Sequence, residues 1–205
     1  MSNEDRQIIQ EIKDGCRSSY NFLVEKYSES LVQFLFRRTL HLQEAEDIAQ
    51  ETFLQGLKKI NTYNAKYSFN TWLFTIARNI SIDRMRSKKI HIVSINDDSH
   101  KEIADHNIED QGQRTIIEEE KKHLWHLAQS LPIGSYELLQ LFYAEEKTIA
   151  DIAYITRKTK TGVKVGLYRA RKLLLKKINS EENSVSVDTF SHSLANNLKP
   201  LGNQS

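Results

Sequence analysis

The sequence is poor in cysteine, proline and glycine, with one, two and seven residues among 205. The single thiol, Cys16, excludes an internal disulfide framework and a structural zinc site built on paired thiolates, and it suits a reducing cytoplasm. Few helix breakers are present, and Leu, Ile, Glu, Lys and Gln fill the long stretches between them. The composition therefore predicts an all-helical chain.

Long hydrophobic runs and a one-sided charge are also missing. The densest apolar stretch, residues 31–36, is interrupted by Gln33 and is far too short to cross a bilayer. The polar residues 1–6 lack the apolar core of a signal peptide. We therefore expect a cytoplasmic protein without membrane insertion. A net charge of +2 is too small to indicate nucleic-acid binding by itself, so the distribution of the charges has to decide.

Signatures of catalysis and of metal binding are absent from the sequence. It has no glycine-rich phosphate loop and no nucleophile with a plausible base, so we predict no enzymatic activity and no cofactor. His123 and His126 lie three residues apart on an expected helix, but no third ligand is near them, and we predict no metal site.

The first half carries three apolar stripes with helical spacing, after a short leading helix around residues 8–12. The stripes consist of Tyr20, Leu23, Val24, Tyr27, Leu31, Phe34 and Leu35, then Ala45, Ile48, Ala49, Thr52, Phe53, Gly56 and Ile60, then Phe69, Trp72, Leu73, Ile76, Ala77 and Ile80. They predict a helical bundle over residues 1–89, with Trp72 in its core.

The second half predicts a smaller helical domain behind a linker. Periodicity disappears over residues 90–112, which are acidic and read as a flexible linker. Helical patterns return over 113–179, and Pro132 marks the first turn of a helix there. The residues 180–205, rich in Ser and Asn, are expected to form a disordered tail.

Residues 148–177 have the pattern of a helix-turn-helix with a strongly basic second helix. Thr159 is placed to cap that helix. Nine basic residues and no acidic one lie between Arg157 and Lys177, which is typical of an element whose second helix enters the major groove. A solvated basic face on a structural helix is the alternative reading of the same charges.

This half resembles the fourth conserved region of RNA polymerase sigma factors in four strings: 131–132 (LP), 141–143 (LFY), 149–153 (IADIA) and 167–173 (LYRARKL). The resemblance implies that the second helix reads the −35 promoter element. The residues implied as DNA contacts are Thr159, Lys160, Thr161, Lys164, Val165, Tyr168, Arg169 and Arg171. Two positions depart from the family pattern. Arg157 replaces the usual turn glycine and requires a different turn or a left-handed conformation, and Val165-Gly166 replaces a Ser-Arg pair and weakens the helix by roughly 1 kcal/mol.

The first half looks like the second conserved region of extracytoplasmic-function (ECF) sigma factors. The resemblance is carried by 45–53 (AEDIAQETF), Phe69, 72–79 (WLFTIARN) and 83–84 (DR), in the family's order and spacing. It implies that the helix face opposite the second apolar stripe binds the clamp coiled coil of the polymerase's largest subunit. That face is formed by Asp47, Gln50, Glu51 and Leu54.

The family uses the loop over residues 61–68 to receive a flipped base of the −10 element. Aromatic rings and cations around this loop suit the capture of an unpaired strand, since stacking contributes roughly 1–3 kcal/mol per base. The residues expected to bind and melt the −10 element are Tyr63, Asn64, Tyr67, Thr71, Thr75, Arg78 and Arg86. Asn70 stands where relatives often have an Arg, so one backbone contact is expected to be missing.

Together the two resemblances imply a dissociable sigma factor that directs promoter-specific initiation and melts promoter DNA. Its implied partners are core RNA polymerase (the clamp coiled coil and the flap), promoter DNA, and an anti-sigma factor, which can be membrane-bound. From the residues alone a second hypothesis stays open, a stand-alone helix-turn-helix transcriptional regulator whose first bundle senses a ligand or dimerises. An adaptor without a DNA role is disfavoured by the uninterrupted basic helix.

Overall fold

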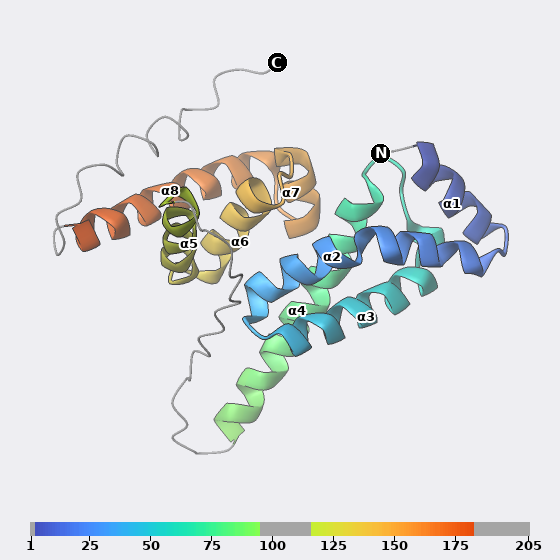
Figure 1. The fold of residues 1–205 in the computed structure, drawn as a ribbon, viewed down its shortest axis with the longest axis horizontal. Helices are drawn as coiled ribbons and strands as arrows, with labels where there is room; N and C mark the ends of the chain where they lie inside the picture. Colours follow the sequence, from blue (N-terminus) through green and yellow to red (C-terminus); the bar gives the residue numbers. More distant parts are fainter. Residues whose placement is uncertain (1–2, 95–115, 183–205) are drawn as a thin grey trace. The chain divides into compact units, whose positions relative to one another are not determined.

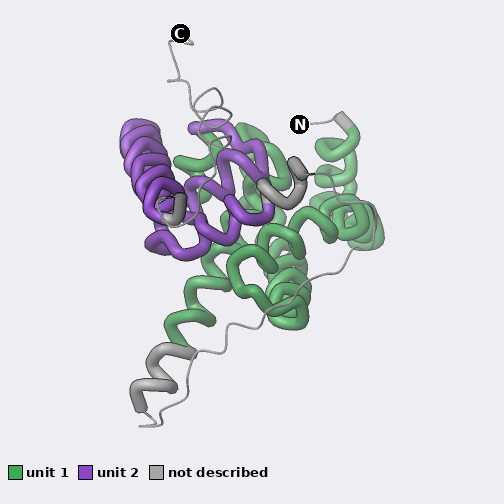
Figure 2. The backbone as a smooth tube through the Cα atoms, turned by 60° about the vertical axis from the view of Figure 1, so that its left-hand side comes forward, with its two compact units in different colours: residues 1–110, 150–158 green, residues 111–149, 159–205 purple. Residues whose placement is uncertain are grey.

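The computed structural model describes residues 3–94 and 116–182, and within these ranges every regular element is helical. Contacts group the chain into two compact units (Figure 2). Unit 1 comprises residues 1–110 and 150–158, and unit 2 comprises 111–149 and 159–205. The domain boundaries predicted from the sequence, 1–89 and 113–179, remain a proposal. The contacts do not test them, because they group residues 150–158 with the first unit and do not divide the chain at a single linker.

Unit 1 is built on three long helices, which are labelled in Figure 1. They are α2 (Tyr20–Thr39), α3 (Leu42–Lys58) and α4 (Phe69–Ser94). The shorter elements are α1 (Asn3–Lys13), the 3₁₀ turns Arg17–Ser19 and Ile60–Thr62, and α7 (Ile149–Thr156). α3 packs against both α2 and α4, as the three apolar stripes predicted.

The core of unit 1 consists of the apolar stripes. Phe34 of α2 and Phe74 of α4 are fully buried, and their rings stack with centroids 4.4 Å apart. Trp72 is 5% exposed, which confirms its predicted place in the core. Each such side chain contributes roughly 1.5–3 kcal/mol of burial free energy, and packing of this density fixes the relative positions of the helices.

The helix α4 is longer than the sequence predicted. It continues to Ser94, whereas the bundle was expected to end near Lys89 and the linker to begin at residue 90. No glycine or proline interrupts residues 69–94, so nothing in the sequence ends the helix at the predicted place. The rest of the expected linker, residues 95–112, lies outside the described residues.

Unit 2 contains α5 (Ile116–Gln129), α6 (Ile133–Leu139), a π-helical segment (Gln140–Ala144) and α8 (Lys160–Glu182). Pro132 immediately precedes α6, in agreement with its predicted role at the start of a helix. The glycine that was expected only to weaken α8 has a packing role. A Cβ atom at Gly166 would lie 2.5 Å from Cδ1 of Leu138 in α6, so the missing side chain lets the two helices approach. Of the expected tail, residues 180–182 continue α8, and 183–205 lie outside the described residues.

Candidate functional site

The outer face of α3 carries the residues expected to bind a helical partner. Asp47 and Gln50 are exposed, Glu51 is half-buried, and Leu54 is 62% exposed although it is apolar. The opposite face of the helix is buried in the core, through Ala45, Ile48, Ala49, Thr52, Phe53 and Gly56. The four predicted residues therefore share one accessible face, which we call the α3 acidic face.

An open groove of about 820 Å³ lies beside this face, between α3 and the second half of α4. Its lining residues include four carboxylates and one arginine, Arg84. The carboxylates are Glu44, Asp47, Glu51 and Asp83. Arg84 Nη2 lies 2.8 Å from Glu51 Oε2. The groove thus presents an excess of negative charge, which attracts a basic partner and orients it.

The pair Arg84–Glu51 was not predicted from the sequence. The two residues lie 33 positions apart on different helices, and no local pattern indicates that they meet. Both side chains are more than one-third exposed, so the ion pair contributes about 0–1 kcal/mol to stability. The pair balances the charge of one carboxylate in the groove, and Arg84 is part of the groove's lining.

The loop over residues 61–68 is shaped by its own hydrogen bonds. The side-chain oxygen Oδ1 of Asn64 accepts from the Lys66 amide at 2.9 Å, and the Tyr67 amide donates to the Asn64 carbonyl at 3.2 Å. Ser68 then caps α4, since its Oγ accepts from the Thr71 amide at 3.1 Å. These bonds hold Tyr67 at the point where the loop enters the helix.

Two residues expected on the exposed surface lie inside unit 1. Tyr63 is 7% exposed, with edge contacts to the rings of Phe69 and Trp72 at 5.9 and 5.5 Å. Burial raises its pKa to about 12, and its hydroxyl donates to the Tyr67 carbonyl at 2.8 Å. In this arrangement the Tyr63 ring is too buried to stack on a base. Its hydroxyl instead supports the loop from the core side, through the bond to Tyr67.

Thr71 is the second buried residue, with 1% of its surface exposed. Its hydroxyl lies 2.8 Å from the Ser68 hydroxyl and donates to Asp151 Oδ1 of α7 at 3.3 Å. The apolar stripe of α4 was predicted correctly. The opposite side of its first turn, which was expected to be exposed, is buried at Thr71. The surface expected for strand capture is therefore narrower than predicted.

The accessible members of this surface are Asn64, Tyr67, Thr75, Arg78 and Arg86. Asn64 and Arg86 are exposed, and the other three are half-buried. The Tyr67 ring stacks on Tyr154 of α7, with centroids 3.9 Å apart and planes 20° apart. In this arrangement Tyr154 covers one face of the Tyr67 ring in an aromatic stack. We call these five residues the α4 capture surface.

The turn before α8 adopts the second of the two conformations expected for it, the left-handed one. Arg157 has a left-handed φ of 56°, and the Lys158 amide donates to the Ala153 carbonyl at 3.0 Å. A left-handed non-glycine residue costs about 1–2 kcal/mol. Thr159 caps α8 as predicted, because its Oγ1 accepts from the Gly162 amide at 3.0 Å.

Of the eight residues predicted on α8 and at its cap, seven are exposed, and Val165 and Tyr168 are 44% and 65% exposed. Arg171 differs from this set. Its Nε donates to the Tyr143 hydroxyl at 2.8 Å, and its guanidinium lies over the rings of Phe142 and Tyr143 at 5.4 and 5.5 Å. The half-buried Arg171 therefore joins α8 to the π-helical segment. The sequence prediction assigned it to DNA because a charge count does not reveal an aromatic partner 28 positions away.

Comparison with known proteins agrees with the arrangement of unit 1. Residues 23–90 match the family model of Sigma-70 region 2. Over 81 residues the chain is 37% identical to the ECF RNA polymerase sigma factor SigW of Bacillus subtilis. Over this stretch the chain is similar to the ECF sigma factors. The alignment covers 40% of this chain and 43% of SigW, so it spans less than half of that relative.

Other comparisons extend over more of this chain. It is 26% identical over 178 residues to the RNA polymerase sigma-H factor of Pseudomonas aeruginosa, with 83% of this chain and 92% of that protein covered. The alternative of a stand-alone helix-turn-helix regulator is not favoured, because it does not explain why residues 23–90 match Sigma-70 region 2.

Two solved structures confirm the all-α fold. The sigma factor RpoE, in complex with the anti-sigma factor NepR from Bartonella quintana, has a TM-score of 0.65 at 20% identity, covering 78% of this chain and 96% of RpoE. CnrH, in complex with the cytosolic domain of CnrY, has a TM-score of 0.63 at 18% identity, covering 87% and 99%. Within the described ranges, no helix is both long enough and apolar enough to pass through a membrane.

Proposed function

We propose that this protein is a sigma factor, a dissociable, non-enzymatic subunit that binds core RNA polymerase in the cytoplasm and directs promoter-specific initiation. The observation that carries the proposal is the α3 acidic face with its groove, on the same unit as the α4 capture surface. A protein-binding face and a strand-binding surface on one rigid bundle suit a subunit that opens DNA only when it is mounted on the polymerase.

The α3 acidic face is proposed to bind the clamp coiled coil of the largest subunit. Asp47, Gln50 and Leu54 are accessible without rearrangement, and the carboxylates of the groove favour a partner helix with basic residues. The exposed Leu54 supplies an apolar contact at the centre of an otherwise polar face. Electrostatic complementarity of this kind raises the association rate and fixes register.

The α4 capture surface is proposed to hold the melted −10 element. Tyr67 would stack on an unpaired base, and Arg78 and Arg86 would hold the strand's backbone. Stacking at about 1–3 kcal/mol per base can favour the unpaired state without ATP once the strand is held. Tyr63 and Thr71, being buried, are proposed to support this surface and not to touch DNA.

The exposed face of α8 is proposed to read the −35 element, with α7 as the preceding helix of the helix-turn-helix. Thr159, Lys160, Thr161, Lys164, Val165, Tyr168 and Arg169 would face the major groove and its phosphates. In domain terms, residues 1–89 would bind polymerase and the −10 element, 90–112 would connect the domains, and 113–179 would read the −35 element and contact the flap.

An anti-sigma factor is proposed as a further partner. RpoE was solved bound to an anti-sigma factor and CnrH was solved bound to the cytosolic domain of CnrY, and both share the fold of this chain. An inhibitor that covers the α3 acidic face would compete directly with polymerase for it.

Transcription in vitro with purified core polymerase and a genomic DNA library tests the proposal. Promoter-specific transcripts that appear only when this protein is added support it. If no transcripts appear across the library, or if the protein alone binds specific duplex sites tightly, the proposal is wrong.

A further inference from the structure

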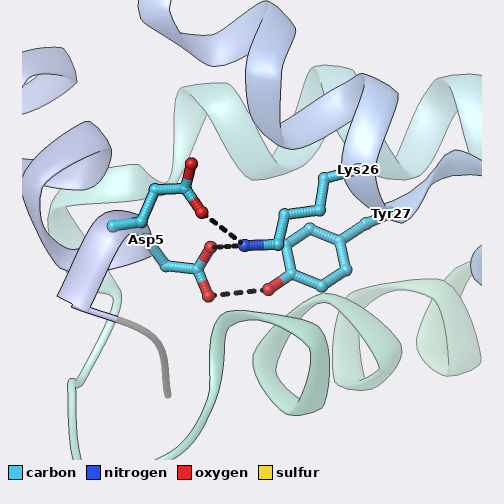
Figure 3. A network of polar contacts seen from close by, with 4 residues as sticks. Asp5, Lys26 and Tyr27 are labelled. Atoms are coloured by element: carbon cyan, nitrogen blue, oxygen red, sulfur yellow. Dashed lines mark hydrogen bonds and ion pairs between the residues drawn. The ribbon is translucent and has the colours of Figure 1, made fainter.

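A nearly buried carboxylate joins the first helix to the second. Asp5 of α1 is 2% exposed, and its Oδ1 lies 2.7 Å from Lys26 Nζ. Its Oδ2 accepts the hydrogen of the Tyr27 hydroxyl at 2.7 Å, as Figure 3 shows. The Lys26 ammonium also reaches Glu4 at 3.3 Å. A buried carboxylate is unfavourable unless it is paired and hydrogen-bonded, so this cluster holds α1 and α2 in one arrangement.

The ring of Tyr27 connects the Asp5 cluster to the residues that support the loop 61–68. Its centroid lies 5.5 Å from that of Phe69, the first residue of α4, and Phe69 makes an edge contact with Tyr63. Tyr63 in turn donates its hydroxyl hydrogen to the carbonyl of Tyr67. An unbroken series of contacts therefore leads from a carboxylate in α1 to the backbone of the residue that carries the stacking ring.

The base of the loop also rests on α1 directly. Helix α1 packs against the 3₁₀ turn Ile60–Thr62, which immediately precedes Tyr63. Ile9 and Ile12 of α1 are 4% and 5% exposed, so the helix is anchored by apolar burial as well as by Asp5. Because packed interiors leave little free volume, a shift of α1 or of the Tyr27 ring has to displace the residues behind the loop.

We propose that Asp5 and Tyr27 are positioning residues that fix the angle and height of the Tyr67 ring for a captured promoter base. The inference rests on the proposed function of the loop and adds α1 to the machinery of strand capture. Neither residue touches DNA; each acts through Phe69 and Tyr63. Displacements near 1 Å are enough to weaken a stacking contact that depends on alignment.

The test uses holoenzyme assembled from core polymerase and the full chain, with single-stranded −10 oligonucleotides from a promoter identified by transcription in vitro. Each base is replaced in turn by an abasic site, and the affinity ratio of intact to abasic strand is measured. In the wild-type protein, we expect one position at which the ratio is about 5 to 150, the range of a stacked base. Tyr27→Phe and Asp5→Asn should lower that ratio at least about threefold.

A matched control comes from the same cluster. Glu4→Gln removes a carboxylate that contacts the same Lys26 but is 72% exposed, and it should leave the ratio unchanged. Tyr27→Phe keeps the ring and loses only the hydroxyl, so it serves if Asp5→Asn does not fold.

The outcomes separate this inference from the proposed function. A ratio that Tyr27→Phe leaves unchanged, or an equal loss of affinity for intact and abasic strands, overturns the positioning role and leaves only a structural one. If the wild-type holoenzyme shows no base-dependent position at all, the proposed role of the loop is wrong.

Discussion

The phenolic oxygen of Tyr20 in α2 lies where the side chain of residue 56 in α3 would begin: a Cβ atom at Gly56 would be only 2.6 Å from it. The hydroxyl donates to the Phe53 carbonyl at 2.8 Å, one turn earlier in α3. Leu73 and Trp72 of α4 approach the same point, to 3.5 and 3.7 Å. Gly56 is thus the place where the three long helices of unit 1 converge.

Gly56→Ala should destabilise unit 1 even though alanine favours a helix by about 1 kcal/mol. The new methyl group forces Tyr20 to leave its hydrogen bond, and overpacking of this kind costs about 1–3 kcal/mol. Urea unfolding followed by Trp72 fluorescence, in a Trp125→Phe background, measures the change. We expect a loss of about 1 kcal/mol, which becomes smaller in a Tyr20→Phe background because the obstructing oxygen is gone.

Gly134→Ala is the control for helix propensity, since nothing lies within 4 Å of the added atom. It should leave unit 2 unchanged or stabilise it by up to about 1 kcal/mol. Equal effects of the two alanines would show that the close approach at Gly56 is unimportant.

Arg157→Gly should stabilise the protein, because glycine adopts the left-handed conformation of this turn without steric conflict. We expect a gain of about 1 kcal/mol, reduced by the greater freedom of glycine in the unfolded chain. Thermal melting by far-ultraviolet circular dichroism checks it against Lys158→Gly at the next position. A fall in melting temperature for Arg157→Gly would mean that its side chain contributes more than its backbone strain costs.

Much of the fold followed from the sequence, because apolar stripes and terminal residues act locally. The stripes identified Trp72 and the three long helices, and the capping role of Thr159 followed from its place before the basic helix. Arg171, Tyr63 and Gly166 were misjudged for a common reason. What each one does depends on a side chain brought in from another element, and periodicity along a single helix carries no information about that partner.

Arg169→Ala and Arg171→Ala should affect promoter binding in different ways. The exposed Arg169 is free to meet a phosphate, so its loss should lower the salt slope of holoenzyme binding by about 0.9. Arg171→Ala should leave that slope unchanged and destabilise unit 2 by about 1–2 kcal/mol, through the lost ring and hydroxyl contacts. If both variants lowered the salt slope equally, Arg171 would be a DNA contact, as the sequence predicted.

The stability of unit 1 should fall at alkaline pH, in part through Tyr63. Burial raises the pKa of this phenol from 10 to about 12, so the folded state retains a proton that the unfolded chain loses. The stabilisation is complete below about pH 10 and is lost as the pH rises toward 12. Tyr63→Phe should be less stable at neutral pH, where the bond to Tyr67 is lost, and should show a weaker decline over that interval in urea unfolding. If Tyr63→Phe lost stability over this pH interval as steeply as the wild type does, other tyrosines would be responsible for the effect.

The most direct test of the account is the affinity of this protein for core polymerase after charge reversal on the α3 acidic face. Asp47→Lys with Glu51→Lys should weaken association at least about tenfold, because the carboxylates that would meet a basic partner become cations. The control pair Glu25→Lys with Glu29→Lys changes the net charge equally on exposed positions of α2 and should bind as the wild type does. If the α3 variant is folded and binds core polymerase with unchanged affinity, the account is contradicted.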